Sequence, residues 1–190
     1  CYTTGVLKGS GAAGGIGGVL GGSGYIKNCY SSATVIDQIA NNTGKAGGII
    51  GRVNGNASGS SIENCYSSGD ISAIGGGNAG GIVGKVDGGK LVIKNCIAWN
   101  SMLVSTDKAK VGRIVGGTAN ATYENCYAYD GMILKAGEAT FTVSDETSPS
   151  GSSFQGVAKS ANELKNTVIN WDSSLWKEGG NGYPVFKWSK

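Results

Sequence analysis

Five cysteines, thirteen carboxylates and a recurring set of aromatics are the residues that could do chemistry. Histidine is absent from the sequence, so the chain supplies no Ser-His-Asp triad, Cys-His dyad or histidine metal site. The carboxylates do not recur as a pair of the kind that a glycosidase holds across its cleft. Asp70, Asp87, Asp107 and Asp130 lie near turns and are interpreted as solvated turn residues. We therefore expect the chain not to be an enzyme and to need no cofactor.

The cysteines stand at positions 1, 29, 65, 96 and 126, at intervals of 28, 36, 31 and 30. These intervals differ from the short spacings of metal-binding pairs, and they predict a column of small buried thiols, one per repeat. Disulfides between neighbouring repeats are the alternative in an oxidising compartment, although an odd count leaves one cysteine over. A lipidated N-terminal cysteine is an alternative interpretation of Cys1, but its place in the repeat already explains it.

Aromatic residues close to the cysteines form the candidate ligand site. Tyr30 and Tyr66 directly follow their cysteines, whereas Trp99 and Tyr129 lie three residues after theirs. Stacked, exposed aromatics suit a sugar ring or a protein partner. Because Trp99 and Tyr129 occur only in the repeats nearest the C-terminal tail, the preferred interpretation is that they pack beneath that tail.

The elements that position these residues are short repeats. An apolar-x-Asn-Cys motif occurs at residues 26–29, 62–65, 93–96 and 123–126. A glycine-bracketed aliphatic motif begins at Gly14, Gly47, Gly80 and Gly112, at intervals of 33, 33 and 32 residues. Short β-branched runs between glycines are typical of strands between turns. Because one such unit cannot bury its apolar face alone, the units must stack on one another.

This repetition predicts an all-β fold, a parallel β-solenoid (β-helix) of about four to five glycine-rich coils with about three short strands each. Residues 1–135 are assigned to the coils, and residues 136–190 to a loop and a C-terminal capping segment of the same domain. The 35 glycines and only two prolines suit repeated tight turns and exclude collagen. Cys1 and Tyr2 match the middle of a repeat, so we expect the repeat to extend upstream of residue 1.

Stacking would place equivalent residues in columns about 4.8 Å apart along the solenoid. The column before the asparagines alternates in charge and is predicted to face solvent: Lys27, Glu63, Lys94, Glu124. The neighbouring column is predicted to line the core: Ile26, Ile62, Ile93, Tyr123. The asparagine column is predicted to bond amide to amide and to adopt turn dihedrals: Asn28, Asn64, Asn95, Asn125.

Over about residues 1–130 the two motifs together resemble the GLUG motif. The ending, Gly182-Tyr183-Pro184-Val185-Phe186-Lys187-Trp188, is also similar to the closing segment of many such proteins. The resemblance implies a solenoid in a large secreted bacterial protein, as in adhesin-like proteins and the non-catalytic parts of IgA-specific metallopeptidases. Ile97 and Arg113 depart from the pattern, so the resemblance does not predict the shape of the coil around them.

Beyond about residue 140 the periodicity fades, and residues 144–153 are predicted to form a loop. Ser160 and Glu163 have the spacing of a capping box and predict the start of a short helix. Trp171, Trp176 and Trp188 are interpreted as part of a cap for the open solenoid end, in preference to a ligand site.

The net charge of +3, without a clustered basic stripe, argues against nucleic acid as a partner. The sequence has no apolar run of about 18 residues, so membrane insertion is not expected. We expect a non-catalytic adhesion or binding module, extracellular or at the bacterial cell surface, with a host or matrix protein or a glycan as partner. The alternatives are a fibre subunit that self-associates end to end, and a non-catalytic segment of a secreted peptidase or carbohydrate-active enzyme.

Overall fold

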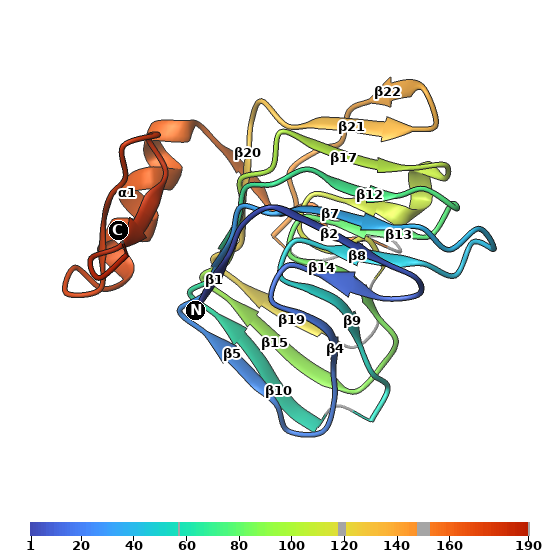
Figure 1. Ribbon diagram of the computed structural model, residues 1–190, viewed down its shortest axis with the longest axis horizontal. Helices are drawn as coiled ribbons and strands as arrows, with labels where there is room; N and C mark the ends of the chain where they lie inside the picture. The colour runs from blue at the N-terminus through green and yellow to red at the C-terminus, as the bar shows by residue number, and fades with distance from the viewer. Residues whose placement is uncertain (57, 118–120, 148–152, 190) are drawn as a thin grey trace.

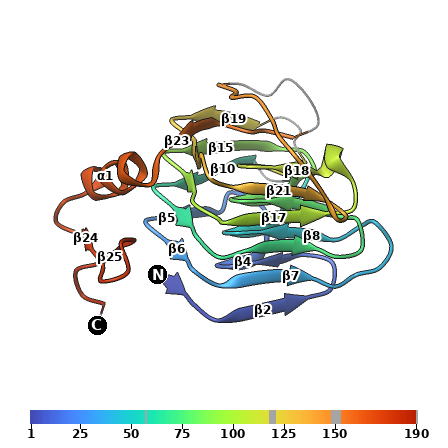
Figure 2. The ribbon, with the colours of Figure 1, turned by 90° about the horizontal axis from the view of Figure 1, so that it is seen from above.

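The computed structural model describes residues 1–56, 58–117, 121–147 and 153–189 (Figure 1). Most of the chain winds into a parallel β-solenoid, and each of its full coils adds one strand to each of five sheets, here called A to E in chain order. Figure 2 shows the strands of successive coils stacked above one another, with the first coil at the bottom. The predicted β-solenoid of about four to five coils is therefore confirmed, with about five turns.

The strands of each sheet are as follows. Sheet A contains β1 (Tyr2–Thr3), β6 (Tyr30–Ser31), β11 (Tyr66–Ser67), β16 (Ile97–Ala98), β20 (Tyr127–Tyr129) and β23 (Val157–Lys159). Sheet B contains β2 (Val6–Gly9), β7 (Thr34–Asp37), β12 (Ile71–Ala73), β17 (Met102–Ser105), β21 (Ile133–Ala136) and the antiparallel β22 (Ala139–Phe141). Sheet C contains β3 (Ala13–Gly14), β8 (Lys45–Gly47), β13 (Asn78–Gly80) and β18 (Val111–Gly112). Sheet D contains β4 (Gly17–Leu20), β9 (Ile50–Val53) and β14 (Val83–Val86). Sheet E contains β5 (Tyr25–Lys27), β10 (Ser58–Glu63), β15 (Lys90–Lys94) and β19 (Ala121–Glu124).

A full coil thus has five strands, where about three were expected. The glycine motif accounts for the difference, because it forms two short strands with a corner between them. A Cβ atom on Gly47 or Gly80 would lie 2.0 Å from the carbonyl oxygen of Ile50 or Val83, respectively, which is too close for any side chain. Glycine therefore lets the backbone turn sharply from sheet C into sheet D.

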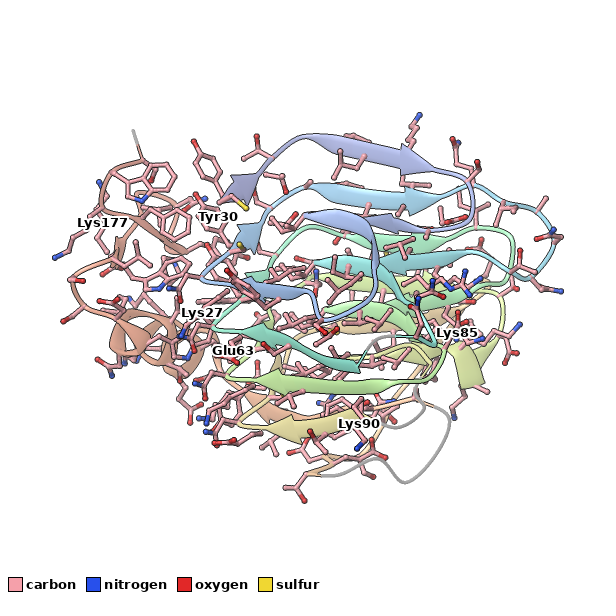
Figure 3. The ribbon with its side chains drawn as sticks, turned by 90° about the horizontal axis from the view of Figure 1, so that it is seen from below. Lys27, Tyr30, Glu63, Lys85, Lys90 and Lys177 are labelled. Atoms are coloured by element: carbon pink, nitrogen blue, oxygen red, sulfur yellow. The ribbon has the colours of Figure 1, made fainter. Side chains whose placement is uncertain are left out.

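The columns predicted from the sequence appear in the registers of the strands. Ile62 pairs with Ile26 on one side and Ile93 on the other, and both Ile62 and Ile93 are fully buried. Lys27 Nζ lies 3.7 Å from Glu63 Oε2, and Lys94 Nζ lies 2.8 Å from Glu124 Oε1. Lys27 and Glu63 lie on neighbouring strands in Figure 3. The predicted outward column of alternating charge is confirmed.

The asparagine column also forms as predicted. Asn28, Asn64, Asn95 and Asn125 have φ between 50° and 54°, in the left-handed region that asparagine tolerates. The Nδ2 atoms of Asn64, Asn95 and Asn125 each donate to the Oδ1 of the asparagine one coil before, at 3.2, 3.0 and 3.1 Å. The column therefore fixes the corner between sheets E and A in every coil.

Next to the asparagines the cysteines form the predicted thiol column. Cys29, Cys65, Cys96 and Cys126 are buried and free, whereas Cys1 is exposed and free. The Sγ atoms of Cys65, Cys96 and Cys126 each lie within 3.8 Å of a backbone carbonyl oxygen in the preceding coil. The thiols therefore act as small core residues that also link the coils.

Residues that follow the last strand of sheet B in the chain cover the end of the stack. Phe154 forms backbone hydrogen bonds of 2.9 and 3.1 Å with Val115, and so adds a short antiparallel rung. Arg113, which departs from the glycine motif, is buried and donates to Gln155 O at 3.1 Å, Gly156 O at 2.8 Å and Asp145 Oδ1 at 2.7 Å. Much of the predicted loop at 144–153 lies outside the described residues.

The segment after β23 contains α1 (Ala161–Trp171) and the hairpin β24 (Trp176–Glu178) and β25 (Pro184–Phe186), together called the tail. Helix α1 begins with the predicted capping box: Glu163 N donates to Ser160 Oγ, and Ser160 N donates to Glu163 Oε2. The sequence interpretation placed the tail aromatics over the solenoid end. The tail instead lies along the side of the stack and runs back to the first coil (Figure 2), because its apolar residues match the aromatic surface of sheet A.

Candidate binding site

The outer surface of sheet A carries two columns of side chains, which point outward because alternate residues of a strand face opposite ways. The first column follows the cysteines: Tyr2, Tyr30, Tyr66, Ile97, Tyr127. The second column lies two residues further along each coil: Thr4, Ser32, Ser68, Trp99, Tyr129. The second column is therefore small and hydroxylic in the first three coils and aromatic in the last two.

The tyrosines of the first column stack face to face. The rings of Tyr2 and Tyr30 are 5.0 Å apart with an interplanar angle of 8°, and those of Tyr30 and Tyr66 are 5.1 Å apart with an angle of 3°. This separation is close to the strand spacing, so the sheet itself sets it. The ring faces are thus occupied by each other, and the ring edges and hydroxyl groups face the tail.

The tail covers this surface. Phe186 lies 5.2 Å from the ring of Tyr30, Trp176 lies 5.9 Å from Tyr66, and the Tyr66 hydroxyl donates to the carbonyl oxygen of Pro184. Tyr30, Tyr66 and Trp99 are at most 6% exposed. Figure 3 shows Tyr30 between sheet A and the tail.

Beneath the tail a recess of about 290 Å³ remains open on the first three coils. Its floor carries the small hydroxyls of the second column, and the tail supplies its outer wall. The lining residues are Tyr2, Thr4, Tyr30, Ser32, Tyr66, Ser68, Asn181, Tyr183, Val185 and Ser189. All ten side chains are uncharged, eight carry a hydroxyl group and one carries an amide.

The fourth coil ends the recess. Trp99 occupies the position that Ser68 holds one coil earlier, and its ring lies 4.8 Å from that of Tyr183. The indole fills the space that a serine leaves open, so the recess exists because threonine and serine occupy this column in the first three coils.

Burial keeps the tyrosine hydroxyls protonated. Desolvation, and then the neighbouring Tyr2, raise the pKa of Tyr30. Desolvation, followed by Tyr30 and Tyr183, raises the pKa of Tyr66, and desolvation and then Tyr129 raise that of Tyr183. These hydroxyls therefore stay neutral over the whole physiological range, and that of Tyr66 already donates to Pro184.

The four aromatics proposed from the sequence divide between two roles. Tyr30 and Tyr66 line the recess, whereas Trp99 and Tyr129 pack against the tail above it. Trp99 and Tyr129 thus pack beneath the tail, as the preferred interpretation had it, and Tyr30 and Tyr66 also contact the tail.

Sequence reasoning missed the hydroxyl column. The signal was present, since a hydroxylic residue stands three positions after the first, second and third cysteines as Thr4, Ser32 and Ser68. The tail residues Asn181, Tyr183 and Ser189 had no such signal, because the tail does not repeat.

Two further findings concern the described residues only. No group of three or more histidine, cysteine or acidic side chains is placed to hold a metal ion within that part of the chain. Among the helices described there, none has the length and apolar character to cross a bilayer.

The comparisons with known proteins agree with this geometry. The family model of the GLUG motif matches residues 42–72. This stretch begins in the turn between β7 and β8, includes β8 to β11, and ends at the start of β12. Residues 42–72 therefore carry the GLUG motif, within the longer stretch where the sequence resembles it.

A solved structure from Bacteroides ovatus, described as a "putative immunoglobulin A1 protease", is 51% identical to the chain with a TM-score of 0.92. The similarity covers 100% of this chain and 57% of that one, so the chain spans little more than half the length of that protein. No curated protein matches the sequence.

Proposed function

We propose that the chain is a non-catalytic adhesion or binding module of a secreted bacterial protein, displayed outside the cell, and that it contacts its ligand in the recess between sheet A and the tail. The observation that carries the proposal is the recess itself, with its converging hydroxyl and amide groups. Concave sites lined by aromatics and a few polar groups are where proteins bind small ligands.

The proposal is tested by screening the purified chain against arrays of glycans and of host and matrix proteins. Ser68→Trp extends the indole column by one coil and fills the recess, so it should abolish the binding that the unaltered chain shows. Ser72→Trp is the matched control, because Ser72 points outward from sheet B, away from the tail. Binding that survives Ser68→Trp would place the ligand elsewhere, and the absence of binding to every array would refute a binding module.

A second candidate is a scaffold segment of a secreted peptidase-like protein. The similarity to the Bacteroides ovatus protein supports it, since 51% identity over the whole chain indicates a shared role for this region. On this proposal the chain binds immunoglobulin A1 without cleaving it. Surface plasmon resonance against immobilised IgA1, with gel analysis of the IgA1 afterwards, tests both halves.

The remaining alternative is that the partner is a second copy of the chain, bound end to end in a fibre. Light scattering of the same samples addresses it, because a fibre subunit would show a mass that grows with concentration, whereas a binding module would keep the mass of one chain.

A further inference from the structure

We infer that the recess takes one uncharged sugar residue of a neutral glycan. The inference rests on the proposed binding function and names the chemical class of its ligand. It is carried by the composition of the lining, the size of the recess and the surface at its rim.

The lining matches a polyhydroxylated, uncharged ligand. Each serine, threonine or tyrosine hydroxyl both donates and accepts a hydrogen bond, as each sugar hydroxyl does. Thr4, Ser32 and Ser68 stand in successive coils, so their hydroxyls form a row with the strand spacing of about 4.8 Å. A carboxylate, sulfate or phosphate would lose its hydration here without a cation among the ten lining side chains to replace it.

The hydrogen-bonding groups in the recess argue against an extended polypeptide. Of the strands beneath the recess, β6 and β11 pair on both sides and β1 on one side, so most backbone groups there are already used in sheet A. A peptide that adds to a sheet needs an unpaired strand edge. The recess instead offers side-chain hydroxyls and the Asn181 amide, which are the groups that recognise a sugar.

The volume favours a single ring. The volume of about 290 Å³ lies just below the range for drug-sized ligands, which begins at about 300 Å³. The Trp99 indole closes the recess toward the fourth coil, so a longer glycan must leave on the side of the first coil.

An exposed aromatic stands on that side. Trp188 is 61% exposed and lies 5.9 Å from Tyr2, which lines the recess. One face of its indole stacks on Phe186 at 4.8 Å with an interplanar angle of 12°. The rest of the ring is open to solvent and can stack on the next sugar of the chain.

Isothermal titration calorimetry against neutral trisaccharides of glucose, mannose, galactose and N-acetylglucosamine tests the inference, with trigalacturonate and sialyllactose as acidic probes and a random peptide library as the third class. We expect at least one neutral trisaccharide to bind and the acidic probes not to bind. Ser32→Ala and Ser68→Ala should each weaken binding about threefold to tenfold, the effect of one hydrogen bond, while Ser72→Ala leaves it unchanged.

The variant Trp188→Ala distinguishes binding of the sugar ring in the recess from stacking of the next sugar on Trp188. It should weaken the trisaccharide and leave the matching monosaccharide unaffected. Ser68→Trp, which fills the recess, should abolish both.

The results of these experiments test the neutral-glycan ligand separately from the proposed binding function. Binding of peptides or acidic glycans alone, lost in Ser68→Trp, would overturn the neutral-glycan inference and leave the binding module standing. Neutral glycan binding that Ser68→Trp does not change would also overturn it. If no probe of any class binds, the neutral-glycan inference and the binding module are both refuted.

Discussion

At the scale of single residues, the asparagine column shows how one side chain can serve two purposes. Its short amide permits the left-handed corner between sheets E and A, and the same amide bonds to the next coil. Alanine would lose both properties and glycine only one.

Asn64→Ala should therefore lower the free energy of unfolding by about 2–4 kcal/mol, from backbone strain and two lost amide contacts. Asn64→Gly should cost about 1–2 kcal/mol, because glycine adopts the positive φ freely. Asn42→Ala is the control, since Asn42 has a φ of 60° outside the column and reports the strain by itself. Urea unfolding measures all three, and equal losses for Asn64→Ala and Asn42→Ala would contradict a role for the amide contacts.

The thiol column makes a second prediction at this scale. Burial raises the pKa of Cys65 and raises that of Cys126 to about 12, and a hydrogen bond from Cys65 followed by burial raises that of Cys29. The thiolate is the reactive form. Iodoacetamide at pH 8 should thus alkylate Cys1 in the folded protein and leave the buried thiols unmodified.

Peptide mass spectrometry after a timed quench reads out each site, and the same reaction in 8 M urea, where all five should react, is its control. Rapid labelling of Cys65 or Cys96 in the folded protein would show that the column opens to solvent.

At the scale of elements, the glycine motif that begins at Gly112 departs from the pattern and binds the residues that cover the end of the stack. Arg113 fills the corner with a side chain and uses it to hold Gln155, Gly156 and Asp145. Restoring the motif by Arg113→Gly should therefore destabilise the protein by about 2–4 kcal/mol, through lost hydrogen bonds to two buried carbonyls.

The same contact predicts a pH dependence. The hydrogen bond from Arg113 lowers the pKa of Asp145 below its ordinary value of 3.8. The resulting stabilisation is present above the unfolded-state pKa and is lost as the pH falls through the folded-state pKa. Unfolding free energies from pH 6 down to pH 2 should fall more steeply for the unaltered chain than for Arg113→Gly. Parallel curves would contradict the coupling.

Much of the element arrangement could be predicted from the sequence, because it is local and repeated. The period fixed which residues stack, so the registers of Ile62, Asn64 and Glu63 with their neighbours follow from counting. The sequence predicted a strand at each glycine motif but not its division into two, because the corner between Gly47 and Ile50 does not change the period. The position of the tail could not be predicted either, because it depends on a surface that exists only after the coils have stacked.

The candidate site divides in the same way. Tyr30 and Tyr66 were found because their position recurs in each repeat, and Ser32 and Ser68 could have been. Asn181 and Tyr183 come from the tail, so their place beside sheet A could be learned only from the folded chain.

At the scale of the whole molecule, the tail and the solenoid form two structures joined by one aromatic interface. Phe186 is central to it, since its ring contacts Tyr30, Trp176 and Trp188. Phe186→Ala should remove about 3–5 kcal/mol from tail docking, as large-to-small changes in a core do.

Hydrogen exchange measured by mass spectrometry tests this. The amides of α1 and β25 should lose protection, whereas those of sheets C and D keep theirs, because the solenoid core does not include the tail. Tyr25→Ala, at an exposed aromatic on sheet E, is the control and should leave both patterns unchanged. Loss of protection in sheets C and D would mean that coils and tail unfold as one unit.

The reversed course of the tail also governs the order in which the protein is completed. Each coil can form on its predecessor about 30 residues after it emerges, as the cysteine intervals show. The bond between Tyr66 and Pro184 joins residues 118 positions apart, so it can form only after Pro184 has been made. Until then the tyrosine column is uncovered, and closing so long a loop is slow. A nascent chain thus exposes the tyrosine column until the tail has been made and covers it.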